Sequence, residues 1–358
     1  MKILVIQQKM IGDVLTTSIL FEALKEKYKT AELHYLINTH TFPVIANNPF
    51  IDKIIYFTPK NEKNKWSLIP FIRQIKKNNY DVVIDVYGKL GSNLITLFSG
   101  ATVKIGYFKK YSSFIFTHPI KRLKQPKKNA SLAIENRMRL LSPLDIPFKN
   151  KSPKIYLQQH EIENTKKVLN FHAIEMDHPL FMISVLGSNP KKTYPANYMA
   201  QLLDQVVLEK PTAQLLFNYI PKQLSEAKEI FDLCSEVTQK QIFFSLFGKS
   251  IREFIALTYH CNALIGNEGG AVNMAKAIQI PTFIIFNPSL NKANWFGDSE
   301  TIDNDAVHLS DFIKYEVEDY EKAKQNSDAY YLKFKPTLIS PKLAQFLSNL
   351  NYSHSSIT

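Results

Sequence analysis

The fold predicted from this sequence is decided by residues 261–289, CNALIGNEGGAVNMAKAIQIPTFIIFNPS. A short apolar strand is expected at 263–265, followed by the polar turn GNEGG at 266–270, a helix at about 271–278 and a second buried strand at 282–286. In such a unit the free N–H groups of the helix N-terminus open beside the strand ends and suit an anion. The turn matches neither GxGxxG nor GxxxxGK(S/T), and turn glycines that merely start a helix explain it equally well.

The same alternation runs through most of the chain and predicts an α/β protein whose parallel sheets are covered on both faces. Strands are expected at 3–6, 33–37, 53–57, 81–85, 103–105, 180–185, 214–217 and 242–246, and helices at about 13–28, 66–77, 91–98, 130–141, 161–170, 196–209, 222–234 and 251–259. Residues 145–153 form a polar, Pro-containing linker. We therefore expect domains at 1–152 and 153–315 and a partly helical tail at 316–358.

The composition is that of a globular protein, with 45% hydrophobic and 21% charged residues. No apolar run reaches the roughly 20 residues that cross a bilayer, and the cytoplasm is the expected compartment. The two cysteines, Cys234 and Cys261, provide neither a disulfide framework nor a metal-binding pattern.

The net charge of +12 favours acidic partners such as nucleic acid, anionic lipid or phosphorylated small molecules. The densest basic run comprises Lys121, Arg122, Lys124, Lys127 and Lys128. No helix-turn-helix, RNA-recognition or zinc-finger signature accompanies this run, so no nucleic-acid partner is expected. A solvated loop and a surface for an anionic partner are equally good interpretations of it.

Three polar loops follow the carboxyl ends of expected strands, where ligands bind in open parallel sheets. They are residues 7–13, 187–195 and 266–270. In the second loop, Ser188, Thr193 and backbone N–H groups suit phosphate oxygens, and a lysine at 191 or 192 supplies positive charge. In the first loop, Asp13 stands at the start of a helix, where a carboxylate that only caps the helix is the commoner case.

Three segments in this order carry a family resemblance: IQQKMIGDVLTTSILFEALKEKY, VLGSNPKKTYPANYMAQLL and LIGNEGGAVNMAKAIQIPTFIIFNPS. Together with IENRMRLLSPLDIP at 134–147, they resemble glycosyltransferase family 9, the ADP-heptose:lipopolysaccharide heptosyltransferases and their relatives. The resemblance spans nearly the whole chain, and the pair Gly12-Asp13 is its most specific part. It implies a GT-B fold, in which two Rossmann-like, doubly wound domains face a central cleft and the C-terminal tail packs back on the first domain.

The resemblance also implies an inverting, metal-independent glycosyltransferase that uses a nucleotide-sugar such as ADP-heptose as co-substrate and needs no cofactor. Its acceptor would be the lipid-linked saccharide of the lipopolysaccharide inner core, reached by peripheral association with the inner face of the cytoplasmic membrane. Asp13 matches the family's general base. The donor-binding residues expected are Gly187, Ser188, Lys192, Glu268, Gly269, Gly270 and Asn273. The acceptor-binding residues expected are Gly12, Lys121, Arg122, Lys124 and Lys127, and no metal ligands are expected.

The donor side departs from the family pattern. The usual acidic-Thr-Gly-Pro/Leu-x-His turn reads EGGAVN at 268–273, so a hydroxyl and an imidazole are missing. The family's Gly-Pro-Thr is replaced by NPS at 287–289, and no glutamate is evident at 218–223. These changes leave two alternatives: the same fold acting on another nucleotide-sugar or surface-glycan acceptor, and a non-catalytic relative that binds a nucleotide or glycan. Retention of Asp13 favours catalysis.

Overall fold

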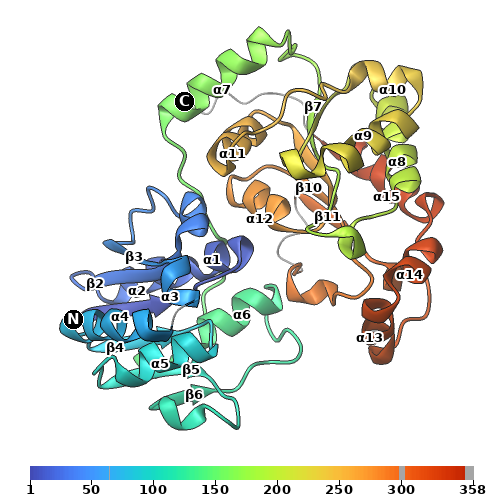
Figure 1. Cartoon of the computed structure of the whole chain (residues 1–358). Coiled ribbons are helices and arrows are strands. Elements are labelled where there is room, and N and C mark those ends of the chain that lie inside the picture. Colours follow the sequence, from blue (N-terminus) through green and yellow to red (C-terminus); the bar gives the residue numbers. More distant parts are fainter. Residues whose placement is uncertain (64, 298–302, 351–358) are drawn as a thin grey trace. The chain divides into compact units, whose positions relative to one another are not determined.

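A computed structural model describes residues 1–63, 65–297 and 303–350. The chain divides into two compact units, Met1–Tyr156 and Leu157–Thr358 (Figure 1). The boundary lies a few residues beyond the expected 152/153 division. Among the described residues, no helix is long and apolar enough to cross a membrane.

The first unit is built on a parallel sheet in the order β3-β2-β1-β4-β5-β6. Its strands are β1 (Lys2–Ile6), β2 (Glu32–Asn38), β3 (Lys53–Phe57), β4 (Val82–Asp85), β5 (Val103–Tyr107) and β6 (His118–Ile120). This is the doubly wound order, in which the chain leaves the central strand β1 first to one side and later to the other. The switch point therefore lies between the carboxyl ends of β1 and β4.

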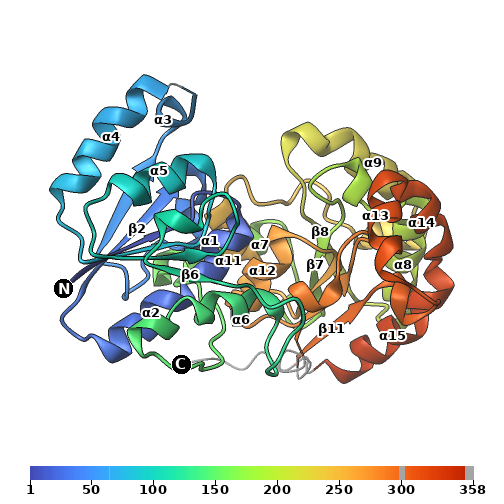
Figure 2. The same cartoon turned by 90° about the horizontal axis from the view of Figure 1, so that it is seen from below.

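Helices cover both faces of this sheet (Figure 2). They are α1 (Ile11–Thr17), α2 (Ile19–Lys27), α3 (Pro59–Lys63), α4 (Lys65–Lys77), α5 (Leu90–Phe98) and α6 (Leu132–Arg139). Because strand side chains alternate between faces, Leu4 and Ile6 pack in one cluster with Ile75 of α4 and Ile95 of α5. On the other face Tyr35 of β2 packs against Phe21 of α2, with ring centroids 4.7 Å apart.

The second unit repeats this architecture with a parallel sheet in the order β11-β10-β9-β7-β8. Its strands are β7 (Leu180–Ser184), β8 (Gln214–Phe217), β9 (Ala263–Asn267), β10 (Thr282–Ile285) and β11 (Asn304–Val307). Its helices are α7 (Gln159–Phe171), α8 (Ala196–Glu209), α9 (Leu224–Leu233), α10 (Glu236–Gln241), α11 (Ile251–Tyr259), α12 (Gly270–Ala277), α13 (Val317–Gln325), α14 (Ser327–Lys333) and α15 (Pro336–Asn349). Here the switch point lies between β7 and β9, the first and third strands of the unit.

Two sequence-based expectations about elements are wrong, and two short strands were missed. Residues 242–246 form no strand and contribute only an isolated bridge between Leu215 and Ile242. The helix expected at 13–28 is two helices, which meet at Ser18. The short outer strands β6 and β11 were not expected, and β6 contains Pro119, which lacks the N–H that ladder pairing uses.

The described part of the tail packs on the core of the second unit. Ile339, Leu343 and Leu347 of α15 lie in the same buried cluster as the apolar face of α8. The Tyr194 hydroxyl donates to the Phe334 carbonyl at 2.6 Å. The tail to residue 350 is thus part of the second unit, and packing of its end on the first domain stays a prediction, because residues 351–358 lie outside the described residues.

Candidate functional site

In the first unit the site centres on Asp13, in the first turn of α1 after β1. Its Oδ1 accepts a hydrogen bond from Arg137 Nη2 of α6 at 2.6 Å. The Arg137 side chain is 8% exposed and that of Asp13 is 34% exposed. Arg137 also donates from Nε to Thr17 Oγ1 at 2.9 Å and from Nη1 to the Ala133 carbonyl at 3.0 Å. A buried guanidinium therefore orients a half-buried carboxylate at the carboxyl edge of the sheet.

No role for Arg137 follows from the sequence pattern, although this residue lies in the segment 134–147 that carries part of the resemblance. The two residues of the ion pair are far apart in the chain, so no local spacing joins them. Gly12, expected to contact the acceptor, precedes Asp13 in α1, and its carbonyl accepts from Thr16 Oγ1 at 2.8 Å.

The two residues before Arg137 anchor the basic loop that was expected to contact the acceptor. Glu135 is 1% exposed, and its carboxylate accepts from the backbone N–H groups of Lys127 and Lys128. The Asn136 side chain pairs with both backbone groups of Leu123. The loop backbone is therefore held on α6, whereas the side chains of Lys121, Arg122, Lys124 and Lys127 are exposed.

Exposed aromatic side chains occur in the chain segment that precedes these cations, and one of them, Phe108, lies beside Lys121. Tyr111 and Phe114 are 71% and 76% exposed, and Phe108 is 40% exposed. The Lys121 ammonium lies 5.7 Å from the Phe108 ring centroid. The Arg122 guanidinium lies 3.8 Å from that of Tyr107, a separation at which cation–π attraction operates. We call Phe108 and the four basic residues Lys121, Arg122, Lys124 and Lys127 the aromatic–basic surface.

A second carboxyl group lies at the end of β4. Asp85 is fully buried, accepts from the Gly88 N–H at 2.8 Å and lies 3.4 Å from Thr96 Oγ1. Burial raises the pKa of Asp85 to about 6, although the hydrogen bonds and the Lys109 ammonium act in the opposite direction. Lys109 Nζ donates to the Gly88 carbonyl at 2.6 Å, which ties the β5–β6 connection to the turn after β4.

In the second unit, Asn267 joins the two loops expected to hold the donor. Asn267, the last residue of β9, is 1% exposed and accepts from the Tyr194 N–H at 2.7 Å. Its amide donates to the carbonyls of Ser184 and Val185, both at 2.9 Å. A Cβ at Gly187 would stand 2.2 Å from the Lys192 carbonyl oxygen, so this loop closes only around a glycine.

The charge of Lys192 acts on the Glu268 carboxyl group at the switch point between β7 and β9. Burial raises the pKa of Glu268, and the Lys192 charge lowers it by a smaller amount. Gly269 has φ of +153°, and no atom lies within 4 Å of where its Cβ would be, so the start of α12 is open to a ligand. The Asn273 amide donates to the Gly269 carbonyl at 3.2 Å and so is turned toward its own helix.

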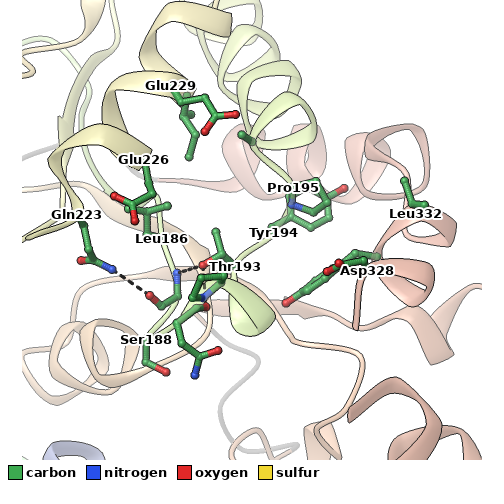
Figure 3. A pocket seen from close by; sticks show the side chains of 16 residues that line it. Leu186, Ser188, Thr193, Tyr194, Pro195, Gln223, Glu226, Glu229, Asp328 and Leu332 are labelled. Carbon is green, nitrogen blue, oxygen red and sulfur yellow. Dashed lines mark hydrogen bonds between the residues drawn. The ribbon is translucent and has the colours of Figure 1, made fainter. Parts of the chain in front are cut away.

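A cavity of about 560 Å³ adjoins the Gly187 loop. Its lining includes Gly187 and Ser188 but not Lys192 or the Glu268–Asn273 turn (Figure 3). The other lining residues are Leu186, Asn189, Pro190, Thr193, Tyr194, Pro195, Ala196, Gln223, Glu226, Glu229, Ile230, Asp328, Tyr331 and Leu332. Three of these are acidic and none is basic, so the cavity suits hydroxyl or amino groups better than a diphosphate. Glu226 and Glu229 follow the 218–223 segment in which no glutamate is found.

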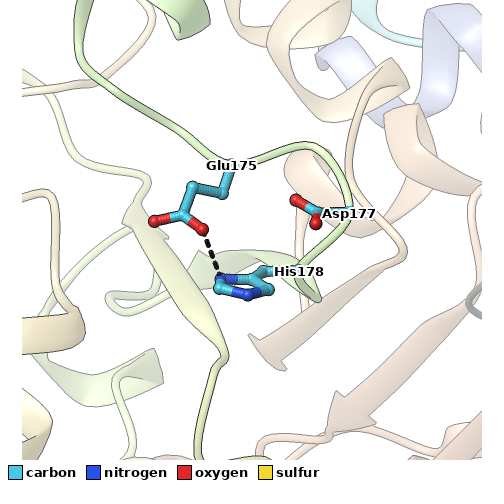
Figure 4. Close-up of side chains that lie close together, drawn as sticks. All are labelled: Glu175, Asp177 and His178. Atoms are coloured by element: carbon cyan, nitrogen blue, oxygen red, sulfur yellow. Dashed lines mark ion pairs between the residues drawn. The ribbon is translucent and has the colours of Figure 1, made fainter.

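One group of potential metal ligands occurs among the described residues: Glu175, Asp177 and His178 (Figure 4). Their ligand atoms lie within 4.8 Å of one another, and His178 Nδ1 is 3.3 Å from a Glu175 carboxylate oxygen. The group precedes β7 and is largely exposed, so it lies at the amino end of that strand. Lys192 follows the other end, and the group is therefore not placed to serve a diphosphate there.

Comparison with known proteins gives a consistent result. The model of glycosyltransferase family 9 (heptosyltransferase) matches residues 68–321. Lipopolysaccharide heptosyltransferase 1 of Campylobacter coli is 24% identical over 306 residues, which cover 83% of this chain and 86% of that protein. The solved glycosyl transferase family 9 from Veillonella parvula DSM 2008 has a TM-score of 0.78 at 18% identity, covering 97% and 96% of the two chains. The E. coli ADP-heptose lps heptosyltransferase II has a TM-score of 0.68 at 17% identity, covering 93% and 99%.

Proposed function

The chain belongs to glycosyltransferase family 9, with its GT-B fold and glycosyltransferase activity, and we propose that it transfers heptose or a related sugar from a nucleotide-sugar to a lipopolysaccharide inner core. ADP-heptose is the donor proposed first, because the relatives are named as heptosyltransferases. The observation that carries the proposal is the Asp13 carboxylate, held by the buried Arg137 at the carboxyl edge of the first sheet.

In the proposed reaction Asp13 is the general base. A sugar hydroxyl is a poor nucleophile, and a carboxylate within hydrogen-bond reach takes its proton as the oxygen attacks the anomeric carbon. The new glycosidic bond forms as the bond to the diphosphate breaks, so one displacement inverts the anomeric centre. Arg137 positions the carboxylate and does not itself contact the substrate.

The donor diphosphate is proposed to lie between the Gly187 loop and the start of α12. Lys192 and the helix N–H groups would stabilise the negative charge that develops on the leaving diphosphate. These charges and dipoles perform the role that a metal ion performs in other transferases, which is the basis for proposing metal independence. Ser188, Gly269 and Gly270 complete this proposed donor site.

The acceptor and the membrane are proposed to meet the aromatic–basic surface. Exposed aromatic rings suit the interfacial region of a bilayer, and each Lys or Arg near an anionic lipid surface adds about 1 kcal/mol. The loop backbone is already ordered by Glu135 and Asn136, so less conformational entropy is lost when the surface binds. Peripheral association with the inner face of the cytoplasmic membrane is therefore part of the proposal.

The second candidate function is transfer from a different nucleotide-sugar, because the turn at 268–273 departs from the family pattern. Asn273 stands where the family has an imidazole and donates its amide hydrogen to Gly269. The turn thus lacks two side chains that the family offers to the donor, which favours a changed sugar or base with the same Asp13 chemistry.

A thermal-shift screen against ADP-, UDP-, GDP- and CMP-sugars tests the donor, because a ligand of the native state raises Tm. We expect an ADP-sugar to raise Tm and the Lys192→Ala variant to lose most of that shift. Lys191→Ala is the matched control, since Lys191 is an exposed neighbour in the same loop. Equal loss in both variants would reject the assignment of Lys192, and stabilisation by another nucleotide-sugar would replace ADP-heptose as the donor.

A further inference from the structure

The side chain of Asn287 joins three segments of the second unit. Asn287 lies two residues after β10, where the sequence reads NPS instead of the family's Gly-Pro-Thr, and it is 1% exposed. Its Nδ2 donates to the Lys191 carbonyl at 2.7 Å and to the Tyr331 hydroxyl at 3.0 Å. Its Oδ1 accepts from the Ser289 N–H at 2.7 Å and from Ser289 Oγ at 2.6 Å. An amide side chain has two donor hydrogens and two acceptor lone pairs, so Asn287 uses its whole hydrogen-bonding capacity.

A second buried asparagine holds the same loop from the neighbouring strand. Strands β9 and β10 pair in parallel, and Asn267 is the last residue of β9. The Asn267 side chain accepts from the Tyr194 N–H at 2.7 Å, whereas Asn287 donates to the Lys191 carbonyl. These contacts fix the loop backbone one residue before Lys192 and two residues after it. The backbone of Lys192 is therefore held on both sides by amides at the carboxyl edge of the second sheet.

The tail of the chain supports both of these contacts. Tyr331 of α14 is 3% exposed, and the centroid of its ring lies 6.0 Å from that of Tyr194. The Tyr331 hydroxyl accepts from Asn287, and the Tyr194 hydroxyl donates to the Phe334 carbonyl. Residues 331–334 thus support the loop at both points where the asparagines hold it.

Lys192 is the residue whose orientation depends on this framework. It is half-buried, whereas its neighbour Lys191 is exposed. The Lys192 charge lowers the pKa of Glu268, so the ammonium lies within electrostatic reach of the turn after β9. A lysine carries its charge on a flexible four-carbon stem, so a fixed backbone limits where the ammonium can go. It also reduces the conformational entropy that is lost when the ammonium meets an anion.

We infer that Asn287 and Tyr331 are positioning residues, which fix the backbone of the Gly187 loop so that Lys192 is directed at the donor diphosphate before the donor binds. The inference deepens the proposed function and rests on its assignment of Lys192. We call the hydrogen bonds from Asn287 to Lys191 and Tyr331 the Asn287 brace. The family's glycine has no side chain at this position, so the brace comes with the substitution. The change at 287–289 therefore supports the donor loop, although the change at 268–273 removes side chains.

Two variants weaken the Asn287 brace without changing the net charge. Tyr331→Phe removes the hydroxyl that accepts from Asn287, and Asn287→Ala also removes the hydrogen bond to the Lys191 carbonyl. Both should lower Tm, because buried polar groups lose a partner. Tyr80→Phe is the matched control: this tyrosine of the first unit is also 3% exposed, and its hydroxyl lies 2.7 Å from His34 Nδ1. The control should lower Tm and leave ligand binding by the second unit unchanged.

Inorganic pyrophosphate probes the diphosphate site whichever base and sugar the donor carries. We expect it to bind the full-length wild type, with an apparent Kd that is about tenfold higher in Asn287→Ala, the scale of one neutral hydrogen bond. The increase should be smaller in Tyr331→Phe and absent in Tyr80→Phe. A double-mutant cycle then tests the route, because a residue that acts through Lys192 has no further effect once that side chain is removed. Asn287→Ala should therefore not weaken pyrophosphate binding further in the Lys192→Ala variant.

An unchanged Kd in both brace variants, or an equal change in Tyr80→Phe, would show that the brace only stabilises the fold. Further weakening in the double variant would show that it does not act through Lys192, and no pyrophosphate binding to the wild type would reject the Lys192 site itself. Transfer assays separate the inference from the proposed function. If pyrophosphate responds as expected but no nucleotide-sugar is turned over, the positioning role stands and the proposed reaction fails. If transfer proceeds and donor KM is unchanged in both brace variants, the reaction stands and the inference fails.

Discussion

At the scale of single residues, the ion pair of Arg137 and Asp13 is the basis of the proposed chemistry. The Arg137 guanidinium donates hydrogen bonds to the Thr17 hydroxyl, to the Ala133 carbonyl and to the Asp13 carboxylate. Each of these bonds restricts the rotation of the arginine side chain. Asp13 is thereby held in one orientation, which a general base needs and a simple helix cap does not. Removing the carboxylate's charge while keeping its shape therefore separates the two roles.

We expect Asp13→Asn to lower kcat by about 100-fold or more and to leave donor KM nearly unchanged. The asparagine Oδ1 still accepts from Arg137, so Tm should change little, which thermal unfolding checks. Steady-state kinetics with both substrates saturating measures the effect. Near-native turnover would show that Asp13 only stabilises the start of α1.

The raised pKa of Asp85 predicts that the free energy of unfolding depends on pH. Its pKa is raised by burial from an ordinary 3.8 to about 6, so the folded state binds the proton more tightly than the unfolded state. The free energy of unfolding therefore falls as pH rises from about 4 to about 6, by at most about 3 kcal/mol at 1.36 kcal/mol per pKa unit.

The isosteric variant Asp85→Asn removes this loss. Its stability relative to the wild type should rise between about pH 4 and pH 6 and then stay constant, as measured by urea unfolding at several pH values. Asp177→Asn, at an exposed carboxyl, is the control and should show a difference that does not follow this curve. A pH-independent difference for Asp85→Asn would contradict the raised pKa.

At the scale of elements, α6 organises the first unit's functional edge. Three consecutive residues, Glu135, Asn136 and Arg137, are all buried and point to different partners, because successive side chains on a helix are about 100° apart. Two of them hold the basic loop and the third holds Asp13. The helix thus links the aromatic–basic surface to the proposed base.

Replacing Lys121, Arg122, Lys124 and Lys127 by Gln should raise acceptor KM and weaken binding to anionic vesicles, with donor affinity unchanged. The increase in acceptor KM and the decrease in vesicle binding should both be smaller at high salt, because screening already removes the attraction there. The backbone N–H of Lys127 still reaches Glu135, so the loop should stay in place. Vesicle sedimentation and acceptor kinetics measure the two effects.

A matched control variant neutralises four exposed lysines of the second unit, so its net charge falls by the same amount as that of the first variant. These are Lys166, Lys167, Lys240 and Lys314. If this variant loses as much vesicle binding as the first, the attraction comes from overall charge. If neither variant changes vesicle binding or KM at low salt, the basic run is a solvated loop.

At the scale of the whole molecule, the chain uses one architecture twice and places polar loops at both switch points. The first has a carboxylate held by a buried arginine, and the second has a lysine, a glutamate and an open helix start. These features are the basis for proposing proton transfer from a sugar in the first unit and anion binding in the second. In the part of the chain that the structure describes, the sole group of potential metal ligands precedes β7.

Transfer should therefore continue in excess EDTA, since the proposed diphosphate site relies on Lys192 and helix N–H groups. Product formation with and without EDTA measures this directly. Loss of activity that magnesium or manganese restores would contradict it. His178→Ala then tests whether the exposed group is responsible: a response to EDTA that survives this variant would place the metal elsewhere.

The sequence alone determined the α/β class and the strand-to-helix connections at which Asp13, Lys192 and Glu268 stand. These follow from local hydrophobic periodicity and turn residues, which act within one segment. Only the tertiary structure decided that Arg137 meets Asp13 and that Glu135 and Asn136 hold the basic loop. It also decided that 242–246 is no strand whereas His118–Ile120 is one. Such features depend on which strands and helices become neighbours, and packing between residues distant in the chain sets this, not local propensity.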